Sequence, residues 1–213
     1  MNLKSFPKPF PSHADQQRYK FSDAHRDHVK ELITVNALRR FSYYTVSKTT
    51  LAEIAEDSSL SIFQLSQHFP YKEELVMETL KLLARNYMQE FRSALQESPD
   101  IRILLENIGQ LRIKYYKKYG LVLSDINLYK EPYRKLFAYY QSLQICLFVA
   151  RLRSMAIVTP VKKWTSHLYF NTMDNIYKTL AIAPRFSIDG DLLYQRIKEQ
   201  QEQANQAFAL ALI

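Results

Sequence analysis

Two pairs of polar side chains, each pair three positions apart, form the most informative pattern in this chain. Thr50 is followed by Glu53, and Ser61 is followed by Gln64. A hydroxyl just before a helix accepts a hydrogen bond from a free backbone amide at the helix start. The carboxylate or amide side chain three residues later accepts one from the amide of the hydroxyl residue. Each pair therefore predicts the first turn of a helix.

The two helices that these pairs begin are short and close together. Asp57-Ser58-Ser59-Leu60 leaves room only for a sharp turn between them, and Leu60 and Leu65 have the spacing of a hydrophobic staple. The inward apolar face is supplied by Leu51, Ile54, Ala55, Leu60 and Leu65. This is the layout of a helix-turn-helix, whose second helix can lie in the DNA major groove.

The residues around these helices follow a known pattern without a gap from about 26 to 76. The matching positions are Phe41, Thr49-Thr50-Leu51, Ile54-Ala55, Ser61, Leu65, Phe69-Pro70 and Lys72-Glu73-Glu74-Leu75. In these positions the chain resembles the DNA-binding domain of TetR/AcrR-type bacterial transcriptional regulators. Under a quarter of the chain carries the resemblance, and the remainder agrees only in length and helical character.

Several positions depart from that family pattern. Ser59 and Thr45 stand where glycine is usual, and the Ser59 position turns with a positive φ, which costs serine about 1 kcal/mol. Tyr71 replaces a serine that usually caps the next helix, and a tyrosine cannot cap in that way. In the recognition helix, the usual lysine, glycine, threonine and tyrosine are replaced by Ile62, Phe63, Gln64 and Ser66.

The resemblance implies which side chains would contact DNA. Thr50, Ser61 and Lys72 match family positions that contact phosphates, and Lys48 adds a cation beside them. Candidates for contacts with base edges or the nearby backbone are Gln64, Gln67 and His68. Glutamine can form two hydrogen bonds with adenine, and Ile62 or Phe63 could contact a thymine methyl group.

The function that the resemblance implies is that of a ligand-responsive DNA-binding regulator, most often a repressor. Such a protein is a homodimer with two recognition helices about one DNA turn apart, and a small molecule in its C-terminal domain changes that spacing. The alternative is a TetR-like helical sensor or interaction protein that has lost operator binding. The altered recognition helix favours the alternative, whereas Thr50, Ser61 and Lys72 favour double-stranded DNA as the partner.

Composition favours an all-α protein of one or two small domains. The 213 residues include only three glycines and are 47% hydrophobic. We expect a flexible arm over residues 1–22, a three-helix DNA-binding domain over 23–71 and a helical ligand-binding and dimerisation domain over 72–213. Long helices are expected at about 23–42, 72–96, 100–118, 132–156, 160–181 and 190–212, with a short helix or loop at 121–130. The helix at 132–156 is apolar on most sides and should be central and buried.

Charge is unevenly distributed. Residues 1 to 49 hold nine Lys/Arg and four Asp/Glu, residues 50 to 99 hold four and eight, and residues 100 to 213 hold sixteen and nine. The net charges are therefore +5, −4 and +7, so the helix-turn-helix itself is not strongly basic. Charge alone supports DNA binding only weakly.

Tyrosines and other aromatic residues are dense between residues 115 and 170. Each one alone suggests core packing, but together they can line a cavity because tyrosine has an apolar face and a polar tip. We expect a small-molecule site between the helices at 100–118, 132–156 and 160–181, and an apolar or aromatic ligand that carries an acidic group. The expected lining is Tyr115, Phe137, Tyr140, Gln144, Trp164 and His167.

The helix at 160–181 has two apolar faces, of which one small domain can bury only one well. We therefore expect a homodimer through a four-helix bundle. The last helix would contribute Leu193, Ile197, Ala204, Phe208 and Ala211.

Other function classes find little support. His25 and His28 are a weak metal pair, no catalytic triad, paired carboxylates or glycine-rich phosphate loop stands out, and Cys146 lies in an apolar run that predicts a small buried residue. We expect no enzyme activity, no metal and no cofactor. Without a membrane span or signal peptide in the sequence, a cytoplasmic location is expected.

Overall fold

The computed structural model describes residues 13–126, 130–155, 168–172 and 190–210, and within these ranges all regular secondary structure is helical. The helices are α1 (His13–Tyr44), α2 (Leu51–Asp57), α3 (Ile62–His68), α4 (Lys72–Glu97), α5 (Ile101–Asp125), α6 (Glu131–Ser154) and α8 (Gly190–Leu210). Residues 168–172 are also helical. The all-α fold class is confirmed.

Two helices are longer than expected. α1 begins at His13 and not near residue 23, so part of the segment expected as an arm is helical. The last proline before it is Pro11, and no proline or glycine interrupts the sequence from there to Tyr44. α5 continues through Gly120 to Asp125, because Val122 and Ile126 are buried one turn apart and hold its last turn against other helices.

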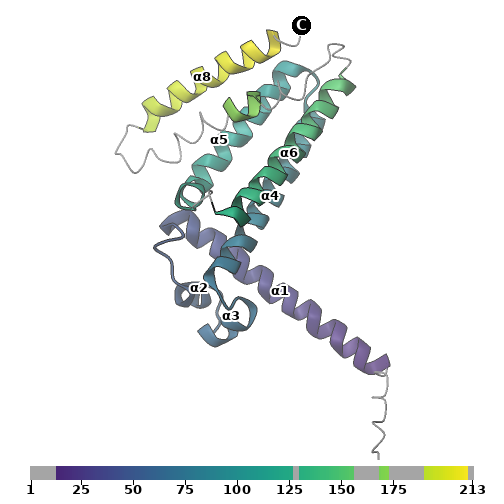
Figure 1. Ribbon diagram of the computed structural model, residues 1–213, viewed down its shortest axis with the longest axis vertical. Helices are drawn as coiled ribbons and strands as arrows, with labels where there is room; N and C mark the ends of the chain where they lie inside the picture. The colour runs from purple at the N-terminus through teal and green to yellow at the C-terminus, as the bar shows by residue number, and fades with distance from the viewer. Residues whose placement is uncertain (1–12, 127–129, 156–167, 173–189, 211–213) are drawn as a thin grey trace, which may run out of the picture.

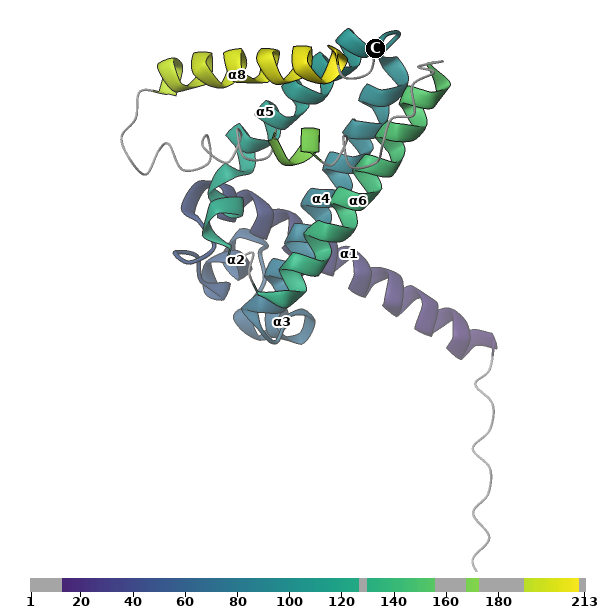
Figure 2. The ribbon, with the colours of Figure 1, turned by 45° about the horizontal axis from the view of Figure 1, so that its top comes forward.

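The helices form a lower group and an upper group (Figure 1). α1 is a long helix whose N-terminal turns extend away from the rest of the chain, while α2 and α3 pack against its C-terminal half. α4, α5 and α6 form the upper group, with α4 in contact with both α5 and α6. α8 lies against α5, at the end of the molecule opposite to α3 (Figure 2).

The interior consists of two hydrophobic clusters. The N-terminal core contains Ile33, Ala37, Phe41, Ile54, Ala55, Leu65, Phe69, Leu75, Val76, Leu80, Val122, Ile126 and Tyr133. The C-terminal core is rich in aromatic residues and includes Phe91, Tyr115, Phe148, Tyr169, Phe170 and Phe208. Because α4, α5 and α6 contribute to both clusters, the helix-turn-helix and the upper helices share one continuous scaffold.

α6 is less buried than the sequence suggested. It buries Tyr133, Ile145, Phe148 and Leu152 on one face, but Tyr139 is 63% exposed and Cys146 is also exposed. The expectations of a central α6 and of a buried Cys146 were therefore wrong. The reason is that, among the helices that the structure describes, α6 packs mainly against α4, and many residues on its other sides are partly accessible.

The apolar residues of α8, the last helix, also differ in their contacts from what the sequence suggested. Ile197 and Phe208, expected at a subunit interface, are buried in the C-terminal core of their own chain, and Ala204 packs against it. Leu193 and Ala211 lie outside the side chains that the structure describes, as does most of the helix expected at 160–181. Among the described residues, no helix combines the length and apolar character needed to cross a membrane.

Candidate nucleic-acid interface

Both predicted helix starts are present as complete capping boxes. The Glu53 amide donates to Thr50 Oγ1 at 3.3 Å, and the Thr50 amide donates to Glu53 Oε2 at 2.7 Å. At α3, the Gln64 amide donates to Ser61 Oγ at 3.2 Å, and the Ser61 amide donates to Gln64 Oε1 at 2.9 Å. Tyr71 precedes α4 without a side-chain cap, as its residue type predicted.

The turns around α2 hold two residues in the left-handed region. Ser59 has a φ of 56° and Thr45 a φ of 68°, at the two positions where the family resemblance expects glycine. The α2–α3 turn is also tied to α1, because Asn36 Nδ2 donates to the Asp57 carbonyl and to Ser58 Oγ, both at 3.2 Å. Hydrogen bonds to α1 thus hold the turn in place despite its strained backbone.

Arg40 fixes α2 against α1. Its guanidinium pairs with Asp57 at 2.9 Å and with Glu53 at 3.0 Å. Hydrogen bonds first to Asp57 and then to Glu53 raise the pKa of Arg40. The hydrogen bond from the Thr50 amide, followed by that from Arg40, lowers the pKa of Glu53 to about 2. The carboxylate that closes the α2 capping box is therefore charged across the physiological pH range.

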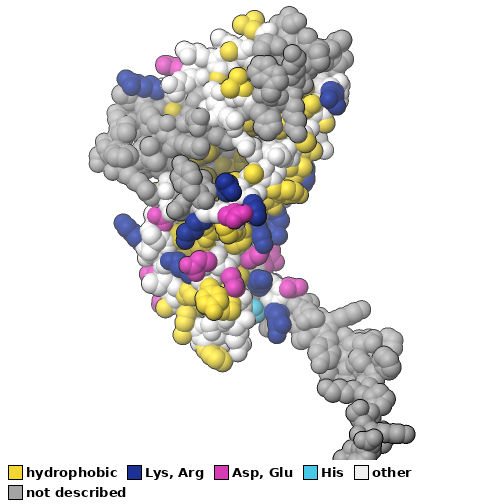
Figure 3. All heavy atoms as spheres, viewed as in Figure 1, with side chains coloured by type: hydrophobic (Ala, Val, Ile, Leu, Met, Phe, Trp, Pro, Cys, Tyr) yellow, Lys and Arg dark blue, Asp and Glu magenta, His cyan; other side chains and the backbone are white. Residues whose placement is uncertain are grey.

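The inner face of α3 packs in the N-terminal core, and its outer face is exposed to solvent. Leu65 and Phe69 are buried in the N-terminal core, and the Lys30 ammonium lies 5.4 Å from the centre of the Phe69 ring. The outward side chains include Ile62 and Phe63, which are 50% and 69% exposed. Figure 3 shows hydrophobic side chains at this lower tip of the molecule, over α2 and α3.

The residues expected to contact DNA lie on or beside this tip. Lys48, Thr50, Ser61, Gln64 and Gln67 are exposed, while His68 and Lys72 are half-buried. The Lys72 ammonium donates to the Thr49 carbonyl, which joins the start of α4 to the start of α2. This structural use of Lys72 was not foreseen, because the two residues are 23 positions apart in the sequence.

Tyr71 is a further candidate for a contact with DNA, and the sequence pattern did not suggest it. It is 66% exposed directly beside Lys72, between α3 and α4. Its position just outside the apolar periodicity of α4 is the only sequence signal that could have identified it.

The described residues that were expected to bind a small molecule lie in different parts of the structure. Tyr115 is buried in the C-terminal core, where its hydroxyl donates to Glu90 Oε1 at 3.0 Å and burial raises its pKa. Tyr140 packs against the same core, whereas Phe137 packs against the N-terminal core. Gln144 Oε1 accepts a hydrogen bond from Arg112 Nη2 at 3.4 Å.

Trp164 and His167 lie outside the described residues. The ligand site between the upper helices therefore stays a prediction.

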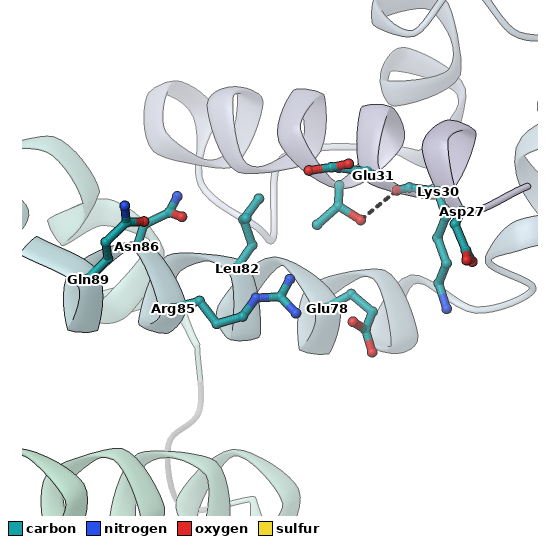
Figure 4. A pocket seen from close by; sticks show the side chains of 9 residues that line it. Asp27, Lys30, Glu31, Glu78, Leu82, Arg85, Asn86 and Gln89 are labelled. Carbon is teal, nitrogen blue, oxygen red and sulfur yellow. Dashed lines mark hydrogen bonds between the residues drawn. The ribbon is translucent and has the colours of Figure 1, made fainter. Parts of the chain in front are cut away.

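A hollow of about 540 Å³ lies elsewhere, between α1 and α4. Its lining is mostly polar or charged: Asp27, Lys30, Glu31, Thr34, Glu78, Leu82, Arg85, Asn86 and Gln89. In Figure 4, Leu82 reaches from α4 toward α1. Thr34 Oγ1 donates to the Lys30 carbonyl at 2.8 Å. Within the described part of the chain, no group of three or more His, Cys, Asp or Glu could hold a metal ion.

Comparison with known proteins gives no match to a family model and none to a curated protein. Solved structures do match over nearly their whole length. The fatty acid degradation regulator FadR from Bacillus halodurans has a TM-score of 0.65 at 13% identity, over 82% of this chain and 93% of that chain. A putative TetR-family regulator from Rhodococcus sp. has a TM-score of 0.63 at 13% identity, over 88% of this chain and 100% of that chain.

A putative TetR-family regulator from Shewanella sp. PV-4 has a TM-score of 0.58 at 16% identity, over 86% of this chain and 97% of that chain. The chain has the TetR-family fold. The likeness extends beyond the helix-turn-helix, which carried the sequence resemblance, to the helices of the upper group. In this TetR-type fold, α2 and α3 are the helix-turn-helix and α3 stands in the place of the recognition helix.

Proposed function

We propose that this chain is a DNA-binding transcriptional regulator that acts as a homodimer on a palindromic operator, most simply as a repressor. The observation that carries the proposal is the presentation of α3. Its inner face is anchored by Leu65 and Phe69, its start is fixed by the Ser61–Gln64 capping box, and its outer side chains are exposed. A short helix that is fixed at its start and on its inner face, and whose outer side chains are exposed, suits insertion into a DNA major groove.

Cations and hydroxyls beside α3 supply the phosphate contacts in this proposal. Lys48 is exposed in the turn before α2, and Thr50 and Ser61 are exposed at the two helix starts. The Thr50 and Ser61 hydroxyls donate to Glu53 Oε2 at 2.8 Å and to Gln64 Oε1 at 3.0 Å, so each would have to turn from this acceptor to donate to a phosphate. Lys72 can serve as well, because an ammonium has three donors and only one is required for the Thr49 carbonyl. Since α3 itself contains no Lys or Arg, most of the electrostatic affinity must come from these flanking residues.

Selection of bound sequences from a random DNA pool tests the proposal. We expect one enriched palindrome at moderate salt, with half-sites about one DNA turn apart. Gln67→Ala, on α3, should reduce the enrichment, whereas Gln89→Ala, at an exposed position of α4, should not. If no sequence is enriched, the DNA-binding proposal fails.

A response to a small molecule is the second part of the proposal. The N-terminal half of α5 packs in the C-terminal core, and its last turn packs in the N-terminal core. Its last residue, Asp125, accepts hydrogen bonds from the Ser47 amide at 2.6 Å and from Ser47 Oγ at 3.0 Å. A shift of α5 on ligand binding would therefore move the turn that leads into α2.

The ligand that we propose is an apolar molecule with an acidic group. Residues 100 to 213 carry a net charge of +7, which favours an acidic ligand. Within them, Arg112 is 4% exposed, lies 4.7 Å from the centre of the Phe170 ring, and donates to the Phe170 carbonyl and to Gln144 Oε1, both at 3.4 Å. FadR, of similar fold, is named a regulator of fatty acid degradation. Long-chain fatty acids are thus suitable probes, and alcohols of the same length are matched controls. We expect only the acids to raise the melting temperature and alter operator binding.

The homodimer is tested by sedimentation of the full chain at micromolar concentration. A dimer is expected, because a palindrome requires two recognition helices. Ile197 and Phe208 are buried within one chain, so these two of the α8 residues first expected at the interface are not available to a second subunit. A monomer, both free and on the selected DNA, would contradict this part of the proposal.

The alternative function is a TetR-like sensor or interaction protein without operator binding. The specific observation in its favour is the outer face of α3, which carries exposed Ile62 and Phe63 and no cation. Under this alternative, the chain responds to a ligand in the fatty acid assay but enriches no DNA sequence.

A further inference from the structure

The outer face of α3 has an unusual balance of chemical groups for a helix that reads DNA. Ile62 and Phe63 are exposed side by side at its start, and neither belongs to the N-terminal or the C-terminal core. Consecutive residues project about 100° apart around a helix, so the two side chains cover adjoining parts of the exposed surface. Apolar side chains therefore occupy the part of α3 nearest to its first turn.

The polar side chains of α3 are partly used inside the chain. Gln64 Oε1 already accepts from the Ser61 amide at 2.9 Å and from Ser61 Oγ at 3.0 Å. Ser66 Oγ donates to the Phe63 carbonyl at 2.7 Å. Reading adenine through two hydrogen bonds requires both the oxygen and the nitrogen of a glutamine amide, so Gln64 cannot read adenine without breaking its own cap. Gln67 is the exposed glutamine that the cap leaves available.

The major groove contains one apolar group that such a surface can recognise, the C5 methyl group of thymine. Phenylalanine contact with this methyl is a known form of base recognition, and the same methyl occurs on 5-methylcytosine. The groove edges are otherwise hydrogen-bond donors and acceptors, which Ile62 and Phe63 cannot satisfy.

On the basis of the proposed function, we infer that α3 selects its operator chiefly through base methyl groups. Phe63 and Ile62 contact the C5 methyl groups of one or two neighbouring thymines in each half-site. Gln67 adds a hydrogen bond to a nearby base, and the flanking residues Lys48, Thr50 and Ser61 hold the helix in the groove without reading sequence.

Replacing thymine by uracil in the selected operator tests this inference, because it removes only the methyl group and keeps the base pair. Binding of the full-length chain is measured by fluorescence anisotropy on thymine and uracil duplexes. We expect roughly fourfold weaker binding for each contacted methyl removed, the factor for leaving one methyl-sized apolar group unburied. In duplexes with cytosine at the same position, 5-methylcytosine should restore part of the binding.

Two variants test whether this preference for thymine over uracil depends on the side chains of α3. The double variant Ile62→Ala/Phe63→Ala should bind the thymine and uracil duplexes almost equally, and because Ile62 and Phe63 are 50% and 69% exposed its melting temperature should stay close to that of the parent. Tyr139→Ala, which removes an exposed aromatic residue from α6, should keep the full preference for thymine.

The outcomes separate this inference from the function on which it rests. If a palindrome is selected but thymine and uracil duplexes bind equally, the methyl inference is overturned and DNA binding stands. If the preference for thymine persists in the double variant Ile62→Ala/Phe63→Ala, the methyl contact belongs to other residues and the inference is again overturned. If no DNA is enriched, both fail, and the apolar face of α3 is better explained as a protein-binding surface.

Discussion

At the scale of single residues, Thr45 and Ser59 hold backbone conformations that side chains disfavour. Their φ angles of 68° and 56° lie in the left-handed region, where a Cβ atom crowds the neighbouring backbone. The Ser59 amide bonds to the Glu56 carbonyl at 2.9 Å, and the Leu60 amide bonds to the Ala55 carbonyl at 2.9 Å. These bonds end α2 and require the conformation whether or not the residue is glycine.

Ser59→Gly should therefore stabilise the protein. Relief of the left-handed strain, about 1–2 kcal/mol, outweighs the entropy cost of glycine, about 0.5–1 kcal/mol, so a net gain of about 0.5–1 kcal/mol is expected in urea unfolding. The same substitution at Ser93, an exposed position inside α4, is the control and should destabilise by about 0.5–1 kcal/mol. Equal effects at both positions would show that the strain at Ser59 is negligible.

The two lysines near α3 should differ in what they contribute. Lys48→Ala should weaken binding to all DNA sequences alike, without changing stability. It should also flatten the log–log salt dependence by about 0.9 for each phosphate that the lysine no longer neutralises. Lys72→Ala should in addition lower the free energy of unfolding, because its ammonium bonds to the Thr49 carbonyl. Anisotropy at several salt concentrations and urea unfolding measure the two effects.

Lys198→Ala, at an exposed position of α8, is the control and should change neither measurement. An unaltered salt slope in Lys48→Ala would remove Lys48 from the residues that bind phosphate.

At the scale of elements, α2 is held by electrostatics as much as by apolar packing. Only Ile54 and Ala55 of its seven residues are buried. The Thr50–Glu53 capping box and the pairing of Arg40 with Glu53 and Asp57 supply the remaining attachment. Because Glu53 takes part in both, its ionisation should control how firmly α2 docks on α1.

This link makes the stability of the fold depend on pH. The folded state lowers the pKa of Glu53 from 4.5 to about 2, so its contribution to stability is full above about pH 4.5 and is lost as the pH falls through about 2. Glu53→Gln keeps a capping side chain but has no charge. Urea unfolding should show the parent to be more stable than Glu53→Gln at pH 6, with the difference shrinking below pH 4.5 and vanishing near pH 2. A difference that does not change with pH would refute this account.

At the scale of the whole molecule, α5 connects the two cores and supports α8. The contact between α5 and α8 is close at Gly109, where an added Cβ would lie 1.5 Å from Gln201 Nε2. Gln201 is 4% exposed, so its side chain has little free space into which it could move. Gly109 therefore allows the end of the Gln201 side chain to lie close to α5, and a larger residue there would require that side chain to move.

Gly109→Ala should destabilise the protein by about 1–3 kcal/mol, because the new methyl group overpacks the α5–α8 contact. In a Gln201→Ala background, the same change should become neutral or stabilising by up to about 1 kcal/mol, since the space is then free and alanine favours the helix. Urea unfolding of the four variants of this cycle measures the reversal. An identical effect in both backgrounds would mean that Gln201 is not the obstacle.

Local interactions made the helix-turn-helix predictable from the sequence. Both capping boxes, the turn between them, the missing cap at Tyr71 and the buried position of Leu65 depend on residues close together in the chain. The same holds for the all-α class, which follows from helical periodicity and few glycines. For this reason the expected starts of α2, α3 and α4 agree closely with those observed.

Contacts between residues distant in the chain were decided only by the tertiary structure. The Lys72–Thr49 bond, the Asp125–Ser47 bonds and the burial of Ile197 and Phe208 in the C-terminal core depend on how helices pack, and periodicity does not specify which apolar face meets which neighbour. For the same reason the exposure of Cys146 was missed. The sequence by itself determined which helices form and how α3 begins, because those are local free energies. Packing between the helices determined which side chains remain at the surface to meet a partner.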